Sequence, residues 1–198
     1  MNRFSVMYRL GLTPWERRDV EQTWRSLLQA PDAPATGRAL DVGCGSGRDA
    51  VHLAKLGWQV TAIDFVDAAL ASARQRAEQE GVQVEWVQGD VGKLGEIGLE
   101  PGFALLYDFG CLHGLSDEAR RGAARGLTDL AAPDATLLLL AFKAGRRIFL
   151  PRGMSEDQIL TLLGDAWDLQ SRQSQVSDDL PAPIRHAEPT LYRLNRRA

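Results

Sequence analysis

The stretch ALDVGCGSGRDA, residues 39–50, contains residue types and a spacing from which a ligand can be predicted. Its glycines alternate at Gly43, Gly45 and Gly47, and they follow Asp41. A glycine-rich turn between a strand and a helix presents backbone N–H groups to a ligand, most often a phosphate. A carboxylate at the mouth of the turn would repel a phosphate and attract an ammonium or sulfonium group. The loop therefore predicts a ligand that carries positive charge.

Two common nucleotide-binding motifs do not fit this stretch. The dinucleotide fingerprint G-x-G-x-x-G would need a glycine at position 48, where Arg48 stands. That third glycine permits close packing of helix on strand, which an arginine side chain prevents. The phosphate-binding loop G-x-x-x-x-G-K is missing from the sequence. Together with Asp41, these observations argue against a nicotinamide oxidoreductase and exclude a P-loop.

Two further carboxylates end the next two predicted strands. Asp64 ends the segment WQVTAID, and an acid in that place can accept hydrogen bonds from both ribose hydroxyls. Asp90 ends the segment VQVEWVQGD, where a carboxylate can accept from the amino group of an adenine. The predicted ligand is an adenosine with a positively charged amino-acid tail.

The apolar pattern places these residues in a chain of alternating strands and helices. Strands are predicted at 38–42, 58–64, 82–90, 102–110, 135–142, 167–175 and 189–197. Helices are predicted at 14–30, 48–57, 66–81, 116–133 and 155–165. Near-continuous apolar strands that alternate with helices indicate a parallel sheet covered on both faces. The last two strands lack a helix between them and should pair antiparallel. We expect a Rossmann-like three-layer α/β sandwich, with a mostly parallel seven-stranded sheet and an antiparallel last strand.

The chain resembles the class I S-adenosylmethionine (SAM)-dependent methyltransferases. The resemblance spans roughly residues 38–142 and rests on ALDVGCGSGRDA, VTAIDFVDAAL, VQGDV, LLYDFGCLHGL and LAAPDATLLLLAF. It departs from the family at Ala104, where an acid is usual, and at PDA, residues 133–135, where P-G-G is usual. The resemblance implies SAM as cofactor and S-adenosylhomocysteine (SAH) as product.

The resemblance also implies a part for individual residues. Asp41, Gly43 and Gly45 would line the methionine end, with Cys44 as a small packed residue of the same loop. Asp64 would hold the ribose, and Phe65 would flank the adenine. Asp90 and Val91 would contact the adenine amino edge.

Candidate catalytic residues follow the fourth predicted strand, in YDFGCLHGL. SAM is already an activated donor, so the protein has mainly to align a nucleophile, and a base is needed only for a protonated acceptor. Asp108 could hold the methionine ammonium or orient an acceptor N–H or O–H. His113 resembles a histidine of the family's L-H-H-L segment and could be a base or a structural residue.

Two segments are expected to shape the acceptor side. Small-molecule branches that resemble thiopurine, thiol and tellurite methyltransferases carry an N-terminal helix with a P-W segment, which here is Pro14 and Trp15, with Tyr8 nearby. The segment FKAGRRIFLPRG brings further cations to the same face. They are Lys143, Arg146, Arg147 and Arg152, and they predict contact with an acidic substrate. Because no insertion is long, we expect a small S, N or O nucleophile as acceptor.

Composition narrows the partners. The 198 residues carry a net charge of −3 and no basic stripe, so nucleic acid is not expected, although an RNA methyltransferase or a non-catalytic SAM-binding module stays an alternative. The two cysteines lack metal-ligand spacing and indicate a reduced, cytoplasmic setting without metal. We expect one domain, 1–198, as a monomer or homodimer without membrane attachment. It would comprise a helical lid (1–30), a SAM-binding core (38–142), and a substrate-side loop with closing strands (143–198).

Overall fold

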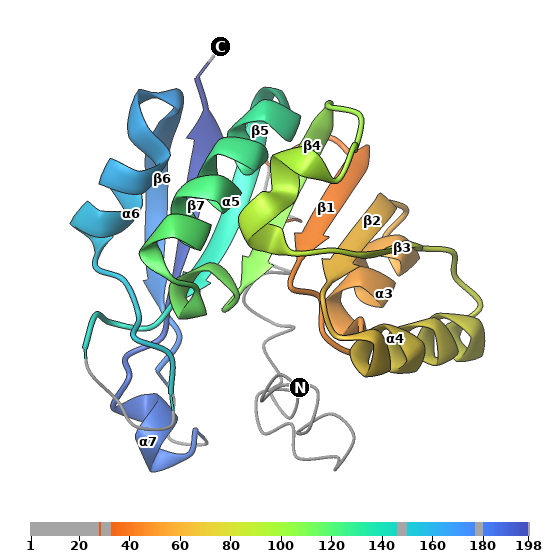
Figure 1. The fold of residues 1–198 in the computed structure, drawn as a ribbon, viewed down its shortest axis with the longest axis horizontal. Helices are drawn as coiled ribbons and strands as arrows, with labels where there is room; N and C mark the ends of the chain where they lie inside the picture. Colours follow the sequence, from red (N-terminus) through yellow and green to blue (C-terminus); the bar gives the residue numbers. More distant parts are fainter. Residues whose placement is uncertain (1–27, 29–32, 146–149, 177–179, 198) are drawn as a thin grey trace.

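The computed structural model describes residues 28, 33–145, 150–176 and 180–197. Apart from Leu28, the expected N-terminal lid (1–30), with Tyr8 and Trp15, lies outside the described residues, as do Arg146 and Arg147. Figure 1 shows the arrangement of the described elements around one sheet.

A seven-stranded sheet in the order β3-β2-β1-β4-β5-β7-β6 forms the centre of the fold. Its strands are β1 (Arg38–Val42), β2 (Gln59–Asp64), β3 (Glu85–Gln88), β4 (Phe103–Phe109), β5 (Ala131–Ala141), β6 (Trp167–Ser174) and β7 (Thr190–Arg196). The first five strands pair in parallel, whereas β7 is antiparallel to both β5 and β6. The predicted mostly parallel sheet with an antiparallel last strand is therefore confirmed.

Helices cover the two faces of the sheet (Figure 1). The described helices are α3 (Arg48–Lys55), α4 (Asp67–Glu80), α5 (Asp117–Leu130), α6 (Glu156–Leu163) and α7 (Ala182–Arg185), with 3-10 helices η2 (Val91–Glu96), η3 (Leu112–Gly114) and η4 (Gly164–Ala166). Leu137 and Leu139 of β5 pack toward α5 and α6, whereas Leu138 and Leu140 pack toward α3. Alternate side chains of a strand point to opposite faces, so burial on both faces explains the unbroken apolar run.

Capping side chains mark the first residues of two helices. Ser116 accepts from the N–H of Ala119 at the start of α5, and Ser155 forms a capping box with Gln158 at the start of α6. Asp67 is of a residue type that often caps a helix, but Val66 holds the N-cap position of α4 without a side-chain bond and Asp67 lies in the first turn. The expectation that the last two strands have no helix between them is wrong, because α7 lies between β6 and β7, although the two strands do pair antiparallel.

None of the described helices combines the length and the apolar character that a bilayer crossing requires. Nor do the described His, Cys, Asp and Glu side chains include a group of three or more suited to hold a metal ion.

Candidate active site

The glycine loop is fastened to the end of the neighbouring strand β2. The N–H groups of Gly43 and Cys44 both donate to the carbonyl of Ile63, at 2.8 and 3.0 Å. The N–H of Gly45 donates to Oδ2 of Asp64 at 2.9 Å. Because β1 and β2 run parallel, their carboxyl ends meet at one edge, the lower edge of the sheet in Figure 1. In open α/β sheets this edge is where ligands bind.

Two of the loop glycines occupy positions that a larger residue could not. A Cβ on Gly43, whose φ is +72°, would lie 2.5 Å from the Cβ of Cys111. A Cβ on Gly47 would lie 2.5 Å from Cη2 of Trp86 and 2.7 Å from the Cβ of Ala73. Gly47 thus allows the loop to pack closely on Trp86 and Ala73, although Arg48 stands where the dinucleotide fingerprint has its third glycine.

Asp41 is a buried carboxylate with an unsatisfied oxygen. It lies near the end of β1 with 2% of its surface exposed, and among the described residues its Oδ2 has no hydrogen-bond partner. Burial raises the pKa of Asp41 well above its usual range, and the carboxylates of Asp49 and Asp108 raise it further. A buried carboxylate oxygen without a partner is costly, so a cationic ligand group at Oδ2 would relieve this cost. The residues present therefore fit the charged tail of SAM.

Asp64 and Phe65 end β2 beside the glycine loop. Asp64 is 7% exposed, and its Oδ1 accepts from the N–H of Val66 at 2.8 Å. A carboxylate has about four acceptor sites, and a contact of Asp64 with the ribose hydroxyls stays a prediction. Phe65 is 42% exposed, which is unusual for a phenylalanine, and its contact with an adenine stays a prediction.

Asp90 and Val91 follow β3. Oδ1 of the exposed Asp90 accepts from the N–H of Gly92 at 2.8 Å and caps η2. The side chain of Val91 is buried in the core cluster on the α5 face. A contact between Val91 and a ligand would therefore use its backbone atoms.

Asp108 is fully buried and organises the turn that follows β4. Its carboxylate accepts from the N–H groups of Gly110 and Cys111, at 3.0 and 3.1 Å, and of Leu112, at 2.8 Å. Burial raises the pKa of Asp108 to about 7, although these three bonds act to lower it. The structure thus gives Asp108 a role in shaping the turn, and its catalytic use stays a prediction.

His113 is buried at the end of the same turn. Its Nδ1 accepts from the N–H of Phe142 at 2.8 Å, and the two rings pack with centroids 4.6 Å apart. Because Nδ1 is an acceptor, we assign the proton of the neutral ring to Nε2. A base at Nε2 would require the other tautomer and would break the bond to Phe142. Use of His113 as a base stays a prediction, under that constraint.

The cations after β5 already have acidic partners where the structure describes them. Nζ of Lys143 lies 2.7 Å from Glu188, and Nη2 of Arg152 lies 2.9 Å from Asp117. The N–H of Lys143 also donates to the carbonyl of Ala187, which joins this segment to the α7 region. The helix α7 was not predicted, because the short run around Pro181 has no helical periodicity.

Arg120, which was not among the predicted site residues, is a buried arginine in α5 that donates to three backbone carbonyls around this edge. The spacing along the helix could have identified this residue, because Arg120 lies on one helix face with the buried Ala123, Ala124 and Leu127. A charged residue at such a position indicates a polar partner within the fold.

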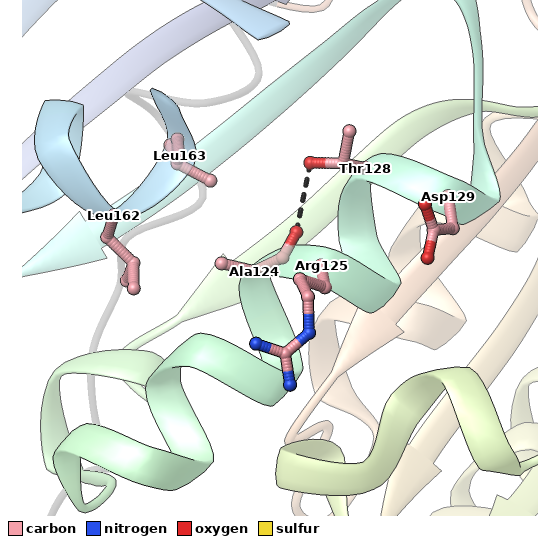
Figure 2. Close-up of a pocket in the computed structure, with 6 residues that line it drawn as sticks. All are labelled: Ala124, Arg125, Thr128, Asp129, Leu162 and Leu163. Carbon is pink, nitrogen blue, oxygen red and sulfur yellow. Dashed lines mark hydrogen bonds between the residues drawn. The ribbon is translucent and has the colours of Figure 1, made fainter. Parts of the chain in front are cut away.

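A small cavity lies away from this edge. Figure 2 shows it between α5 and α6, and its volume is about 200 Å³. Its lining residues are Ala124, Arg125, Thr128, Asp129, Leu162 and Leu163. They come from the C-terminal halves of both helices and include none of the glycine-loop residues, so we do not assign the cofactor to this cavity.

Comparisons with known proteins agree with this geometry. A family model described as a methyltransferase domain matches residues 39–134. An uncharacterized methyltransferase of Schizosaccharomyces pombe is 30% identical over 103 residues, which cover 52% of this chain and 70% of that protein.

Solved structures are similar over nearly the whole chain. One, from work on the conversion of a disulfide bond into a thioacetal group in echinomycin biosynthesis, is 26% identical with a TM-score of 0.75, covering 98% of this chain and 91% of that one. The 1,6-didemethyltoxoflavin-N1-methyltransferase of Burkholderia thailandensis, solved with its substrate and SAH, is 23% identical with a TM-score of 0.76, covering 98% and 86%. The chain belongs to the class I SAM-dependent methyltransferases.

Proposed function

We propose that this methyltransferase transfers the methyl group of SAM to an S, N or O nucleophile of a small molecule, by in-line displacement at the carboxyl edge of the sheet. The observation that carries the proposal is the buried Oδ2 of Asp41, which lacks a partner among the described residues beside a glycine loop. An oxygen of this kind suits the ammonium of a methionine tail and does not suit a phosphate.

The cofactor would lie across the ends of β1, β2 and β3. In this proposal the methionine tail meets Asp41 and the loop formed by Gly43, Cys44 and Gly45. Asp64 accepts from the ribose hydroxyls. The exposed ring of Phe65 flanks the adenine, whose amino edge meets Asp90 and the backbone of Val91.

When bound, SAM supplies an activated methyl group, so the task of the chain is to align an acceptor and exclude water. Asp108 would serve this by fixing the turn after β4, through its three backbone hydrogen bonds. His113 would anchor the turn to Phe142. A thiolate or an unprotonated amine would then need no base, whereas a phenol or thiol would have to lose its proton to another group.

A small acceptor is favoured by the short segments on this face. In this proposal the acceptor site is lined by the segments 143–154 and 175–189 and is completed by the N-terminal lid, residues 1–30. The proposed substrate contacts are Tyr8 and Trp15 of the lid and Arg146 and Arg147 of the first segment. The toxoflavin enzyme of B. thailandensis binds a small heterocycle. The net charge of −3 also disfavours RNA as acceptor, and we keep a cytoplasmic setting as part of the proposal.

Methyl transfer from labelled SAM to a panel of thiols, phenols, amines and oxyanions tests the proposal, with total RNA as a separate arm. The expected result is label in one class of small molecule, with stoichiometric SAH. The Asp41→Asn variant should transfer markedly less label. The control Asp67→Asn, which changes an exposed residue of α4, should transfer as much label as the wild type. Label in RNA alone would overturn the proposal.

A further inference from the structure

Arg120 stands where the pattern of α5 calls for an apolar residue. It is 7% exposed and shares its helix face with Ala123 and Leu127 of the main core cluster. Burial lowers the pKa of Arg120, followed by the nearby charge of Arg152, but a guanidinium stays protonated. A buried charge of this kind is retained only where its donors are satisfied.

Backbone carbonyls satisfy the donors of Arg120, and they belong to two separate segments. Nε donates to the carbonyl of Leu112 at 3.2 Å, and Nη2 donates to that of His113. Nη2 also donates to the carbonyl of Gly153 at 3.0 Å, in residues 150–155, which we call the segment after β5. Nη1 lies 3.8 Å from Asp117, an exposed acid that is closer to Arg152. The carbonyls, and not the acid, therefore explain the position of the side chain.

The turn after β4 is held from both sides. Asp108 accepts from its N–H groups at residues 110–112, whereas Arg120 donates to its carbonyls at residues 112 and 113. The segment after β5 is joined to the same unit, since the N–H of Met154 donates to the carbonyl of Phe142 and the N–H of Phe142 donates to His113. Arg120 thus donates to both segments, and Arg152, which belongs to the segment after β5, adds one bond between them, to the carbonyl of Leu115 at 3.1 Å.

We propose that Arg120 is a positioning residue, which keeps the segment after β5 in register with the turn after β4 and so aligns the acceptor with the cofactor. This inference rests on the proposed function, in which the acceptor binds at the carboxyl edge of the sheet. Arg120 would act through the two backbone segments and would touch neither cofactor nor acceptor. Lysine could not replace it fully, because its single ammonium lacks the planar fork that reaches several carbonyls at once.

The experiment compares the full chain with Arg120→Lys, Arg120→Met and the control Arg121→Met, which lies on the exposed side of the same turn of α5. Hydrogen exchange in the presence of SAH should be faster in both 109–116 and 150–155, by about tenfold in Arg120→Met and less in Arg120→Lys. Exchange of 43–56 and the Kd for SAH should stay within about twofold of the wild type. The control should change neither segment.

A kinetic arm uses the acceptor that the panel identifies. In Arg120→Lys the kcat/KM for acceptor should fall about tenfold, while the KM for SAM stays constant. If neither segment, or only one, exchanges faster, Arg120 does not couple them. If SAH binding weakens in parallel with exchange across the whole chain, Arg120 supports the fold in general and the inference is overturned. Exchange and SAH binding need no acceptor, so they test this inference even where the panel yields no product.

Discussion

Asp64 accepts a hydrogen bond at 2.9 Å from the N–H of Gly45, and so joins the end of β2 to the loop that follows β1. The side chain proposed to hold the ribose therefore also sets the shape of the loop proposed to hold the methionine tail. Two parts of the cofactor site depend on one buried carboxylate, and its removal should affect both.

Replacing Asp64 by alanine should weaken SAH binding by at least ~1.5 kcal/mol, or about tenfold in Kd, which is the value of a charge-assisted hydrogen bond. Titration calorimetry measures the change, with the exposed Asp67→Ala as control. An unaltered Kd in a folded variant would mean that the ribose lies elsewhere.

Cofactor binding should release a proton from Asp41. Burial raises the pKa of Asp41 in the free protein, and a cationic group against Oδ2 favours the ionised form. Binding then lowers the pKa, so between the two values protons are released and affinity rises with pH. Calorimetry of SAH binding in buffers of different ionisation enthalpy measures the release. Asp41→Asn should abolish it and weaken binding; equal release in this variant would assign the proton to another group.

Asp108 should make the protein less stable as pH rises from about 4 to about 7. Its pKa is about 7 in the folded protein and ~3.9 when unfolded, so the folded state binds the proton more tightly. The stabilisation is complete below the unfolded pKa and is lost as pH passes the folded one. Urea unfolding of wild type and Asp108→Asn checks this, because their stability difference should shrink between pH 5 and pH 8. A constant difference would contradict the raised pKa.

Gly43 and Cys111 should be coupled through their contact. Gly43→Ala should destabilise the protein by about 2–4 kcal/mol, since it adds strain at positive φ and a Cβ 2.5 Å from that of Cys111. Cys111→Gly opens that space. The double variant should therefore lose about 1–2 kcal/mol less free energy of unfolding than the two single variants lose together. Strict additivity in urea unfolding would show that the steric contact is unimportant.

The parts of the fold that the sequence predicted depend on neighbours in the chain. Ser116 and Ser155 cap helices through bonds to the next turn, and the apolar run of β5 reports burial on both faces. Asp41 and Asp64 could be placed at one edge because parallel strands carry their ends to the same side.

The remaining features depend on contacts between segments far apart. The tautomer of His113 depends on Phe142, and the position of Arg120 depends on the carbonyl of Gly153. Asp108 has the right type and place for a ligand contact, and only the direction of its carboxylate reveals the three N–H groups of the turn. A pattern along one chain records which residues are buried, and it does not record which atoms they meet.

The structure of the protein bound to SAH tests the central claim most directly, through the distance from the methionine ammonium to Oδ2 of Asp41. The account predicts a charge-assisted hydrogen bond of about 2.7–2.9 Å there, with the ribose hydroxyls on Asp64. An ammonium held by other groups, with Oδ2 of Asp41 still unpaired, would contradict it.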